Sequence, residues 1–142
     1  MIVLVTGGFD PLHAGHIKYF EAARELGSKL IVGLNSDDWL KRKKGKVFMP
    51  FNERKIILEN LSMVKRVISF NDDDDTACDA IYQLIKMDHK IIFANGGDRT
   101  KDNSPEYDTY SRLPWVRFEF GVGGTDKINS SSSLLKKWKE NV

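Results

Sequence analysis

The sequence predicts an α/β protein with a mostly parallel sheet and helices on both faces. Short apolar, β-branched runs alternate with longer segments whose apolar residues recur at helical spacing. This alternation implies right-handed crossovers between parallel strands. The 142 residues fit a single domain over 1–142, long enough to form a core without disulfides or metal.

The first half of the chain contains two expected strands and two expected helices. In order, these are a strand over 2–5, a helix over 16–26, a strand over 30–34, a basic loop over 41–46, and a helix that carries Ile56, Ile57, Leu61 and Val64. Gly27 is expected to cap the end of the first helix, and Asn52 the start of the second.

The second half repeats the alternation. We expect strands over 67–70, 90–94 and 115–120, with a helix capped by Thr76 after the first of them. The acidic run at 72–75 reads as a solvated loop, because a calcium loop would need alternating ligands and a glycine. The serine run at 130–133 introduces a last helix, with Leu134, Leu135 and Trp138 directed inward.

Three polar segments, 7–16, 35–46 and 95–99, follow expected strands. Because ligands of parallel sheets bind at the carboxyl ends of the strands, these segments should meet at one site. The first is Gly-Gly, then His13-Ala14-Gly15-His16 at a helix start. It is neither a dinucleotide fingerprint nor a P-loop.

Glycines allow close backbone approach, and a helix start binds anions. Gly15 would leave room for a phosphate between His13 and His16, whose N–H groups could stabilise charge on a phosphoryl group in transit. The alternative is that both histidines are ordinary loop and helix residues. A zinc site is disfavoured, because His89 and Cys78 lie on other elements and lack the usual spacing.

The other two segments and the serine run also suit phosphates. The lysines of 41–46 could fold over a triphosphate, although such charge runs are often only solvated. Asp98, within Asn95–Arg99, could hold Mg²⁺ or a substrate hydroxyl, or could lie in an ordinary turn. Hydroxyl and N–H groups at 129–135 suit phosphate oxygens, whereas a plain N-cap needs only one serine.

Composition excludes several classes. A net charge of +2 without a basic stripe disfavours a nucleic-acid partner. Cys78 is the only cysteine, which excludes an intrachain disulfide and fits a cytoplasmic location. The apolar N-terminal run is too short for a membrane span and lacks the basic start of a signal peptide.

The chain resembles the cytidylyltransferase-like nucleotidyltransferases, which include glycerol-3-phosphate, choline-phosphate and ethanolamine-phosphate cytidylyltransferases and the nucleotidyltransferase domain of ADP-heptose synthases. The segment GGFDPLHAGHIKYF resembles the family's G-x-F-D-x-x-H-x-G-H. Lys44-Gly45 with Arg54 resembles K-G…E-R, and NSSSSLL resembles I-S-[ST]-[ST]-x-I. These motifs cover nearly the whole chain in order.

The resemblance implies a Rossmann-like sheet of the H-x-G-H nucleotidyltransferase type, with His13, His16 and Lys44 as catalytic residues. It implies nucleotide binding by a larger set: Thr6, Gly7, Gly8, Phe9, Asp10, Arg54, Gly97, Asp98, Ser130, Ser131 and Ser132. Asp10, Arg99, Lys101 and Arg112 are expected to meet the acceptor. Mg²⁺ is expected to accompany the nucleotide, with no direct protein ligand assigned, and a homodimer is expected.

The expected reaction transfers CMP from CTP to a small phosphorylated or phosphonate alcohol or sugar, releasing pyrophosphate. CTP is preferred because most small single-domain relatives use it. The alternative is an ATP-using enzyme of the ADP-heptose-synthase type: the arginine of the glycerol-type R-T-E-G-I is missing from 125–129, and LIVGLNSDDWLKRKKG is close to the heptose type. A non-catalytic nucleotide sensor and a nucleic-acid binder using 41–46 are hypotheses of other classes.

Overall fold

Five parallel strands form one sheet in the computed structural model, which describes residues 1–87, 89–124 and 130–140. The strand order is β3-β2-β1-β4-β5, so β1 lies at the centre. The strands are β1 (Ile2–Gly7), β2 (Lys29–Leu34), β3 (Arg66–Ser69), β4 (Ile91–Ala94) and β5 (Val116–Glu119). The expected α/β fold with a parallel sheet is confirmed, and each strand lies within two residues of its expected range.

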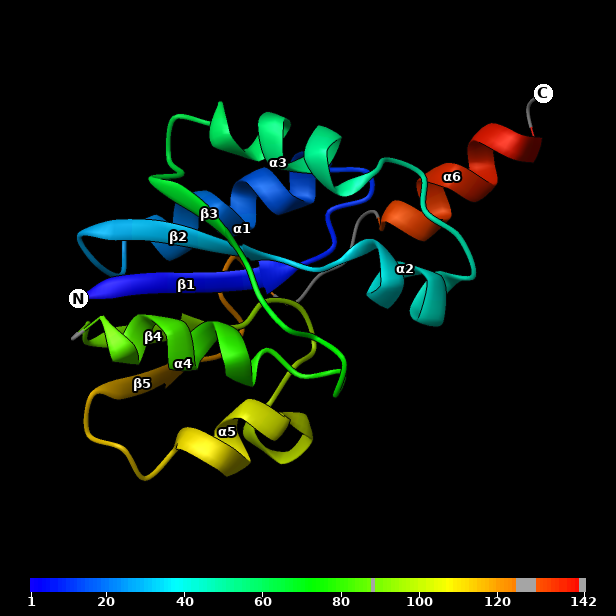
Figure 1. Ribbon diagram of the computed structural model, residues 1–142. Coiled ribbons are helices and arrows are strands. Elements are labelled where there is room, and N and C mark those ends of the chain that lie inside the picture. The colour runs from blue at the N-terminus through cyan, green and yellow to red at the C-terminus, as the bar shows by residue number, and fades with distance from the viewer. Residues whose placement is uncertain (88, 125–129, 141–142) are drawn as a thin grey trace.

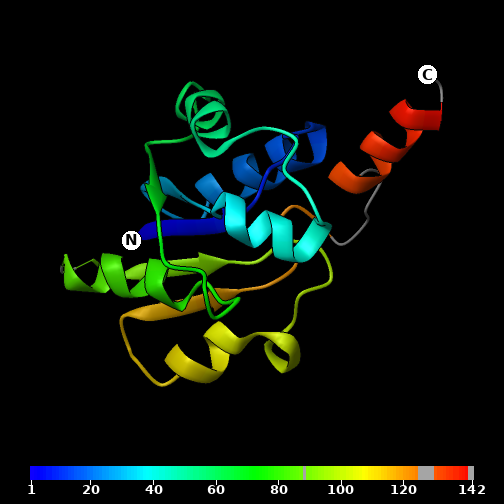
Figure 2. The same cartoon turned by 45° about the vertical axis from the view of Figure 1, so that its right-hand side comes forward.

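Six α-helices accompany the sheet within the described residues. They are α1 (Ala14–Arg24), α2 (Asp37–Lys44), α3 (Phe51–Glu59), α4 (Cys78–Lys86), α5 (Pro105–Tyr110) and α6 (Ser131–Glu140), with a short 3₁₀ turn, η1, at Lys101–Asn103. Figure 1 shows β1 pointing towards α2 and α6, which therefore lie at the carboxyl-end side of the sheet. Seen from a second direction, α6 projects away from the sheet (Figure 2).

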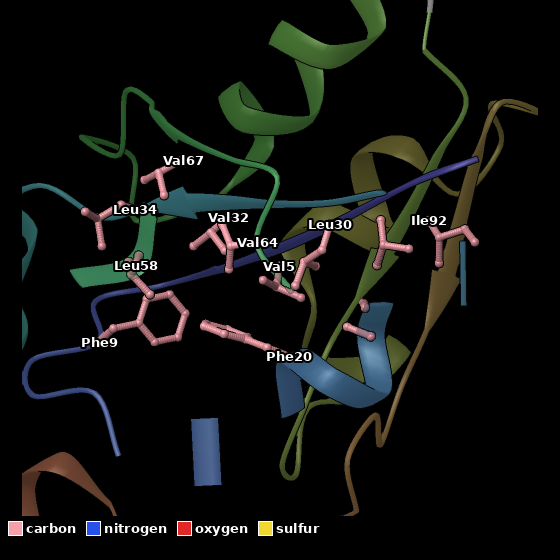
Figure 3. Packing of buried hydrophobic residues seen from close by; sticks show 13 residues of the cluster. Val5, Phe9, Phe20, Leu30, Val32, Leu34, Leu58, Val64, Val67 and Ile92 are labelled. Atoms are coloured by element: carbon pink, nitrogen blue, oxygen red, sulfur yellow. The ribbon is translucent and has the colours of Figure 1, made fainter. Parts of the chain in front are cut away.

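Each face of the sheet packs against its own helices. Alternate residues of β1 point to opposite faces, so Val3 and Val5 join the cluster covered by α1 and α3, whereas Ile2 and Leu4 join the one covered by α4. Figure 3 shows the first cluster, in which Phe20 of α1 packs against apolar side chains of the sheet. This double cover explains why the strands read as continuous apolar runs.

Several expected helix boundaries are wrong. Helix α1 ends at Arg24 and not at Gly27, where a Cβ would collide with the Met1 carbonyl oxygen. Helix α3 is preceded by Pro50, so Asn52 lies inside the helix. Thr76 precedes the cap position of α4 by one residue, although its hydroxyl still accepts a hydrogen bond from the Cys78 N–H at 3.2 Å.

Charged and aromatic segments account for further differences. The expected basic loop is mostly helical, because Lys41 to Lys44 form the end of α2. Asp72 is only 2% exposed, so the acidic run is not wholly solvated. Trp138 does not point inward: it is 64% exposed, because the described part of α6 packs on the protein only near its start. No described helix is long and apolar enough to cross a membrane.

Candidate active site

Helix α1 begins at the two histidines, and both take part in its N-terminal cap. His13 Nδ1 accepts a hydrogen bond from the Gly15 N–H at 3.1 Å, and His16 Nδ1 accepts one from the His13 N–H at 3.2 Å. The rings stack with their centroids 3.8 Å apart. This spacing corrects the expectation of a phosphate between them; a Cβ on Gly15 would come within 2.9 Å of the His13 ring.

These cap bonds fix where each ring carries its proton. Because both Nδ1 atoms accept hydrogen bonds, each neutral imidazole has its N–H at Nε2. Burial, followed by the nearby His13 and Lys44, lowers the pKa of His16 to about 4, and burial and Lys44 also lower the pKa of His13. His16 is therefore a neutral Nε2–H donor at neutral pH. Two such donors on adjacent rings suit the oxygens of a phosphoryl group.

Both rings line a groove of about 590 Å³ at the carboxyl-end side of the sheet. The start of α6 and the turns after β4 and β5 also line the groove. Its lining residues are 13–16, 18, 19, 44, 96–99, 122–124 and 130–132. Two helix N-termini and the cations of Lys18, Lys44 and Arg99 therefore face the same space, opposed by the carboxylate of Asp98. This arrangement favours a polyanion such as a triphosphate.

Tyr19 forms part of the groove and was not singled out from the sequence. Its hydroxyl donates a hydrogen bond to the Ala94 carbonyl, and burial raises its pKa. Its ring lies 3.1 Å from where a Cβ on Gly96 would be, and its Cα lies 2.9 Å from that position on Gly123. The two glycines therefore let the turns after β4 and β5 close onto α1. The glycine pair at 96–97 was visible in the sequence, but its packing partner was not.

Lys44 enters the groove from the last turn of α2. The start of that helix is held by Asp72, whose carboxylate accepts hydrogen bonds from the Ser36 N–H at 2.8 Å, the Ser36 hydroxyl at 2.7 Å and Asn35 Nδ2 at 3.0 Å. The Ser36 hydroxyl in turn caps the helix by accepting from the Trp39 N–H. Burial raises the pKa of Asp72, but these bonds and the nearby charge of Arg42 outweigh that effect and lower it. The placement of α2, and with it that of Lys44 in its last turn, thus depends on a buried carboxylate.

Asp10 holds the segment that follows Lys44 through hydrogen bonds from its backbone. Its two carboxylate oxygens accept the N–H groups of Phe48 and Met49, each at 2.7 Å, and the residue is 2% exposed. Burial lowers the pKa of Lys44, and the nearby Asp10 carboxylate opposes this shift. Asp10 therefore connects the loop after β1 to the loop after α2, and it lines a second pocket beyond the groove.

Arg54 is buried beneath these loops and is 1% exposed. Its guanidinium donates hydrogen bonds to the carbonyls of Met49, Gly8 and Asn35 and pairs with Asp37 at 2.6 Å. It is not among the residues that line the groove. The structure thus gives Arg54 a direct role in holding the loops, and nucleotide contact by Arg54 stays a prediction.

The serine run divides into different roles at the start of α6. Ser130 and Ser132 line the groove, and the Ser130 hydroxyl accepts the Ser133 N–H at 3.1 Å, as an N-cap does. Ser131 also borders the groove, but its hydroxyl donates to the Pro11 carbonyl at 2.7 Å. This bond attaches α6 to the loop after β1. Asn129 and the rest of 125–129 lie outside the described residues.

The remaining predicted residues fall into two groups. Gly97, Asp98 and Arg99 line the groove, whereas the exposed Lys101 and Arg112 line neither of the two pockets. The Phe9 ring, just after β1, meets the His16 ring edge-on, with the ring centroids 5.0 Å apart. Thr6 and Gly7 at the end of β1, and Gly8 and Phe9 just after it, are also not among the residues that line the groove.

Mg²⁺ that arrives with the phosphates of a substrate fits the donors of this site. Among the described residues there is no cluster of three or more His, Cys, Asp or Glu side chains that could hold a metal ion. Among the described residues that line the groove, Asp98 supplies the carboxylate, whereas Asp10 lines the neighbouring pocket and its two oxygens accept backbone N–H groups. Mg²⁺ commonly binds through one or two carboxylates plus substrate phosphates, which fits this donor set.

The comparisons with known proteins agree with this geometry. Residues 4–137 match the model of the cytidylyltransferase-like family, and the chain belongs to that family. It is therefore a nucleotidyltransferase.

The chain is similar to curated bifunctional proteins named HldE. That of Campylobacter concisus is 48% identical over 142 residues, covering 98% of this chain and 27% of the relative. That of Photorhabdus laumondii is 46% identical over 139 residues, covering 91% of this chain and 27% of the relative. The chain thus spans about a quarter of the length of these relatives.

A solved structure gives a similar result. The lipopolysaccharide core biosynthesis protein from Thermoplasma volcanium is 26% identical, with a TM-score of 0.67, and the match covers 89% of this chain and 98% of that one.

Proposed function

We propose that this member of the cytidylyltransferase-like family is an adenylyltransferase that transfers AMP from ATP to a sugar 1-phosphate. The products are an ADP-sugar and pyrophosphate. The observation that carries the proposal is the grouping of His13, His16 and Lys44 in one groove with the N-termini of two helices. Each part of that grouping contributes to binding or stabilising phosphoryl oxygens.

The choice of ATP rests on the relatives. The curated matches are HldE proteins, the class to which the heptose-type resemblance of residues 30–45 points. These relatives favour ATP as the nucleotide substrate. The sequence alone had favoured CTP, because most small single-domain relatives use it. An ADP-heptose-type product requires a sugar 1-phosphate as acceptor, because the sugar is joined to the nucleotide through its anomeric phosphate.

The transfer needs no covalent enzyme intermediate. An anionic oxygen of the sugar phosphate attacks the α-phosphorus of ATP, a new P–O bond forms, and the bond to the bridging oxygen of the β-phosphate breaks in line. No proton has to move, since the attacking oxygen is already ionised. The work of the protein is therefore positioning and charge stabilisation.

The residues have distinct roles in this step. The Nε2–H groups of His13 and His16 donate to α-phosphate oxygens, and the Lys44 ammonium balances the charge that develops there. The start of α6, at Ser130 and Ser132, binds the leaving pyrophosphate. Arg99 supplies a cation for the acceptor phosphate, while Lys101 and Arg112 lie outside the groove lining.

A direct assay tests the proposal. The protein is incubated with Mg²⁺, each of the four nucleoside triphosphates in turn and a set of hexose and heptose 1-phosphates, and pyrophosphate and nucleotide sugars are measured. We expect an ADP-sugar with ATP, and a loss of about 10²–10³-fold in turnover for His16→Ala. A CDP-sugar formed with CTP would overturn the choice of ATP. Pyrophosphate released only with phospho-alcohols would overturn the sugar acceptor.

A further inference from the structure

A second pocket of about 490 Å³ lies beside the groove, between α6 and the segment that follows α2. Lys44 and Ser132 line both spaces. The two therefore adjoin at the residues placed nearest to the transferred and leaving phosphates. The second pocket extends from there along α6 to Trp138 and Lys139.

The pocket combines cations with an apolar wall. Lys44, Lys46, Lys136 and Lys139 line it, together with Val47, Phe48, Leu135 and Trp138. Among the described residues that line it, Asp10 supplies the one carboxylate, and both of its oxygens accept backbone N–H groups. The positive charge is thus not balanced within the pocket lining. An apolar wall also strengthens the attraction between these cations and a bound anion.

Lys46 and Lys139 are 93 positions apart in the sequence, and both line this pocket. The nearby side chain of Lys46 lowers the pKa of Lys139, as expected for two like charges that line one space. Two ammonium groups that line the same pocket repel each other in the free protein. An anion between them removes this repulsion, so the pair is arranged to receive one.

We propose that Lys46 and Lys139 bind the terminal phosphate of the nucleoside triphosphate in this pocket. The proposal rests on the proposed function only for the orientation of the nucleotide, with its leaving pyrophosphate at the start of α6. With the β-phosphate near Ser132, the γ-phosphate is the next group along the chain of phosphates and enters the second pocket. Binding there also joins α6 to the segment after α2, and makes the site selective for triphosphates over diphosphates.

The test compares ATP with ADP in the intact chain. Dissociation constants for both are measured calorimetrically with Mg²⁺ at fixed ionic strength, for wild type, Lys139→Ala and Lys137→Ala. Lys137 lies on the same helix but is not among the residues that line the pocket. We expect Lys139→Ala to weaken ATP binding about tenfold and ADP binding less than about twofold, with Lys137→Ala near wild type. Lys139→Arg should retain most of the preference for ATP.

Two results would overturn the proposal: equal weakening of ATP and ADP by Lys139→Ala, or the same loss with Lys137→Ala, which would indicate only a diffuse positive field. Circular dichroism confirms that the variants are folded. The readout is independent of the acceptor, and CTP and CDP can replace ATP and ADP. A protein that forms no ADP-sugar but still loses triphosphate selectivity with Lys139→Ala would refute the proposed function and retain this site.

Discussion

Replacing Arg54 with alanine should act mainly on stability. The side chain is 1% exposed and donates hydrogen bonds of 2.6–2.9 Å to the carbonyls of Met49, Gly8 and Asn35 and to the Asp37 carboxylate. Alanine would leave three carbonyls without this donor and a cavity in place of the long side chain. It would also leave Asp37 without its partner.

The expected cost follows from these contacts. Breaking a buried ion pair by removing one partner costs about 3–5 kcal/mol. The Asp37 side chain is 37% exposed, so water can replace part of what it loses, and the estimate moves to the lower end of that range. We therefore expect Arg54→Ala to lower the free energy of unfolding by about 3 kcal/mol, and the Tm by about 10 °C for a chain of this length.

Urea unfolding followed by circular dichroism measures this change. Arg54→Lys should fall between alanine and wild type, because it retains the charge but cannot make the forked set of bonds. Lys55→Ala, at the next position of α3, serves as the control. If Arg54→Ala stayed within about 1 kcal/mol of wild type while the KM for the triphosphate rose, Arg54 would belong in the nucleotide site and the structural assignment would be wrong.

Three further outcomes concern the groove. The pKa of His16 is lowered from 6.5 to about 4, so its contribution to stability is present above pH 6.5 and lost as the pH falls towards 4. Between pH 6.5 and 4, the free energy of unfolding of the wild type should fall by about 2–3 kcal/mol more than that of His16→Gln. If the free energies of unfolding of the two proteins fell in parallel with pH, the shift of the His16 pKa would be refuted. Gly15→Ala, with its Cβ 2.9 Å from the His13 ring, should lower kcat about tenfold or more by displacing that ring; unchanged kcat would show that the ring position is unimportant. In steady-state assays, Lys44→Ala should lower kcat about 10²–10³-fold and Lys41→Ala less than about threefold, because Lys44 lines the groove and Lys41 does not. Equal effects of the two substitutions would indicate that the lysines contribute only a diffuse positive charge.

The strands and the meeting of the motifs could be predicted because they depend on short-range apolar patterns and on parallel topology. β1 and β4 are buried on both faces and read as continuous apolar runs. Once the strands are parallel, the segments that follow β1, β2 and β4 must lie at one edge. The structure brings residues of all three into the groove lining.

Elements fixed by polar contacts were harder to predict. Helix α2 buries only Leu40, so its charged sequence has little apolar periodicity, and its start depends on Asp72 from a distant loop. Helix α5 was not predicted, although Ser104 caps it and Pro105 occupies its first turn, a pattern that is readable in the sequence. Nor could spacing alone predict the stacking of the two histidines, because it depends on the rotamers that the capping bonds select.

Three buried charges explain how polar loops are held at this edge of the sheet. Asp10, Arg54 and Asp72 are each 2% exposed or less, and each bonds to backbone groups of loops that contribute to the site. Such loops have little apolar surface to bury, so hydrophobic packing cannot fix them, whereas a buried charge without its backbone partners is costly. The bonds of Asp72 hold the start of α2, and those of Asp10 hold the chain just after Lys44. The position of Lys44 relative to the histidines is thus set by residues that need not touch the substrate.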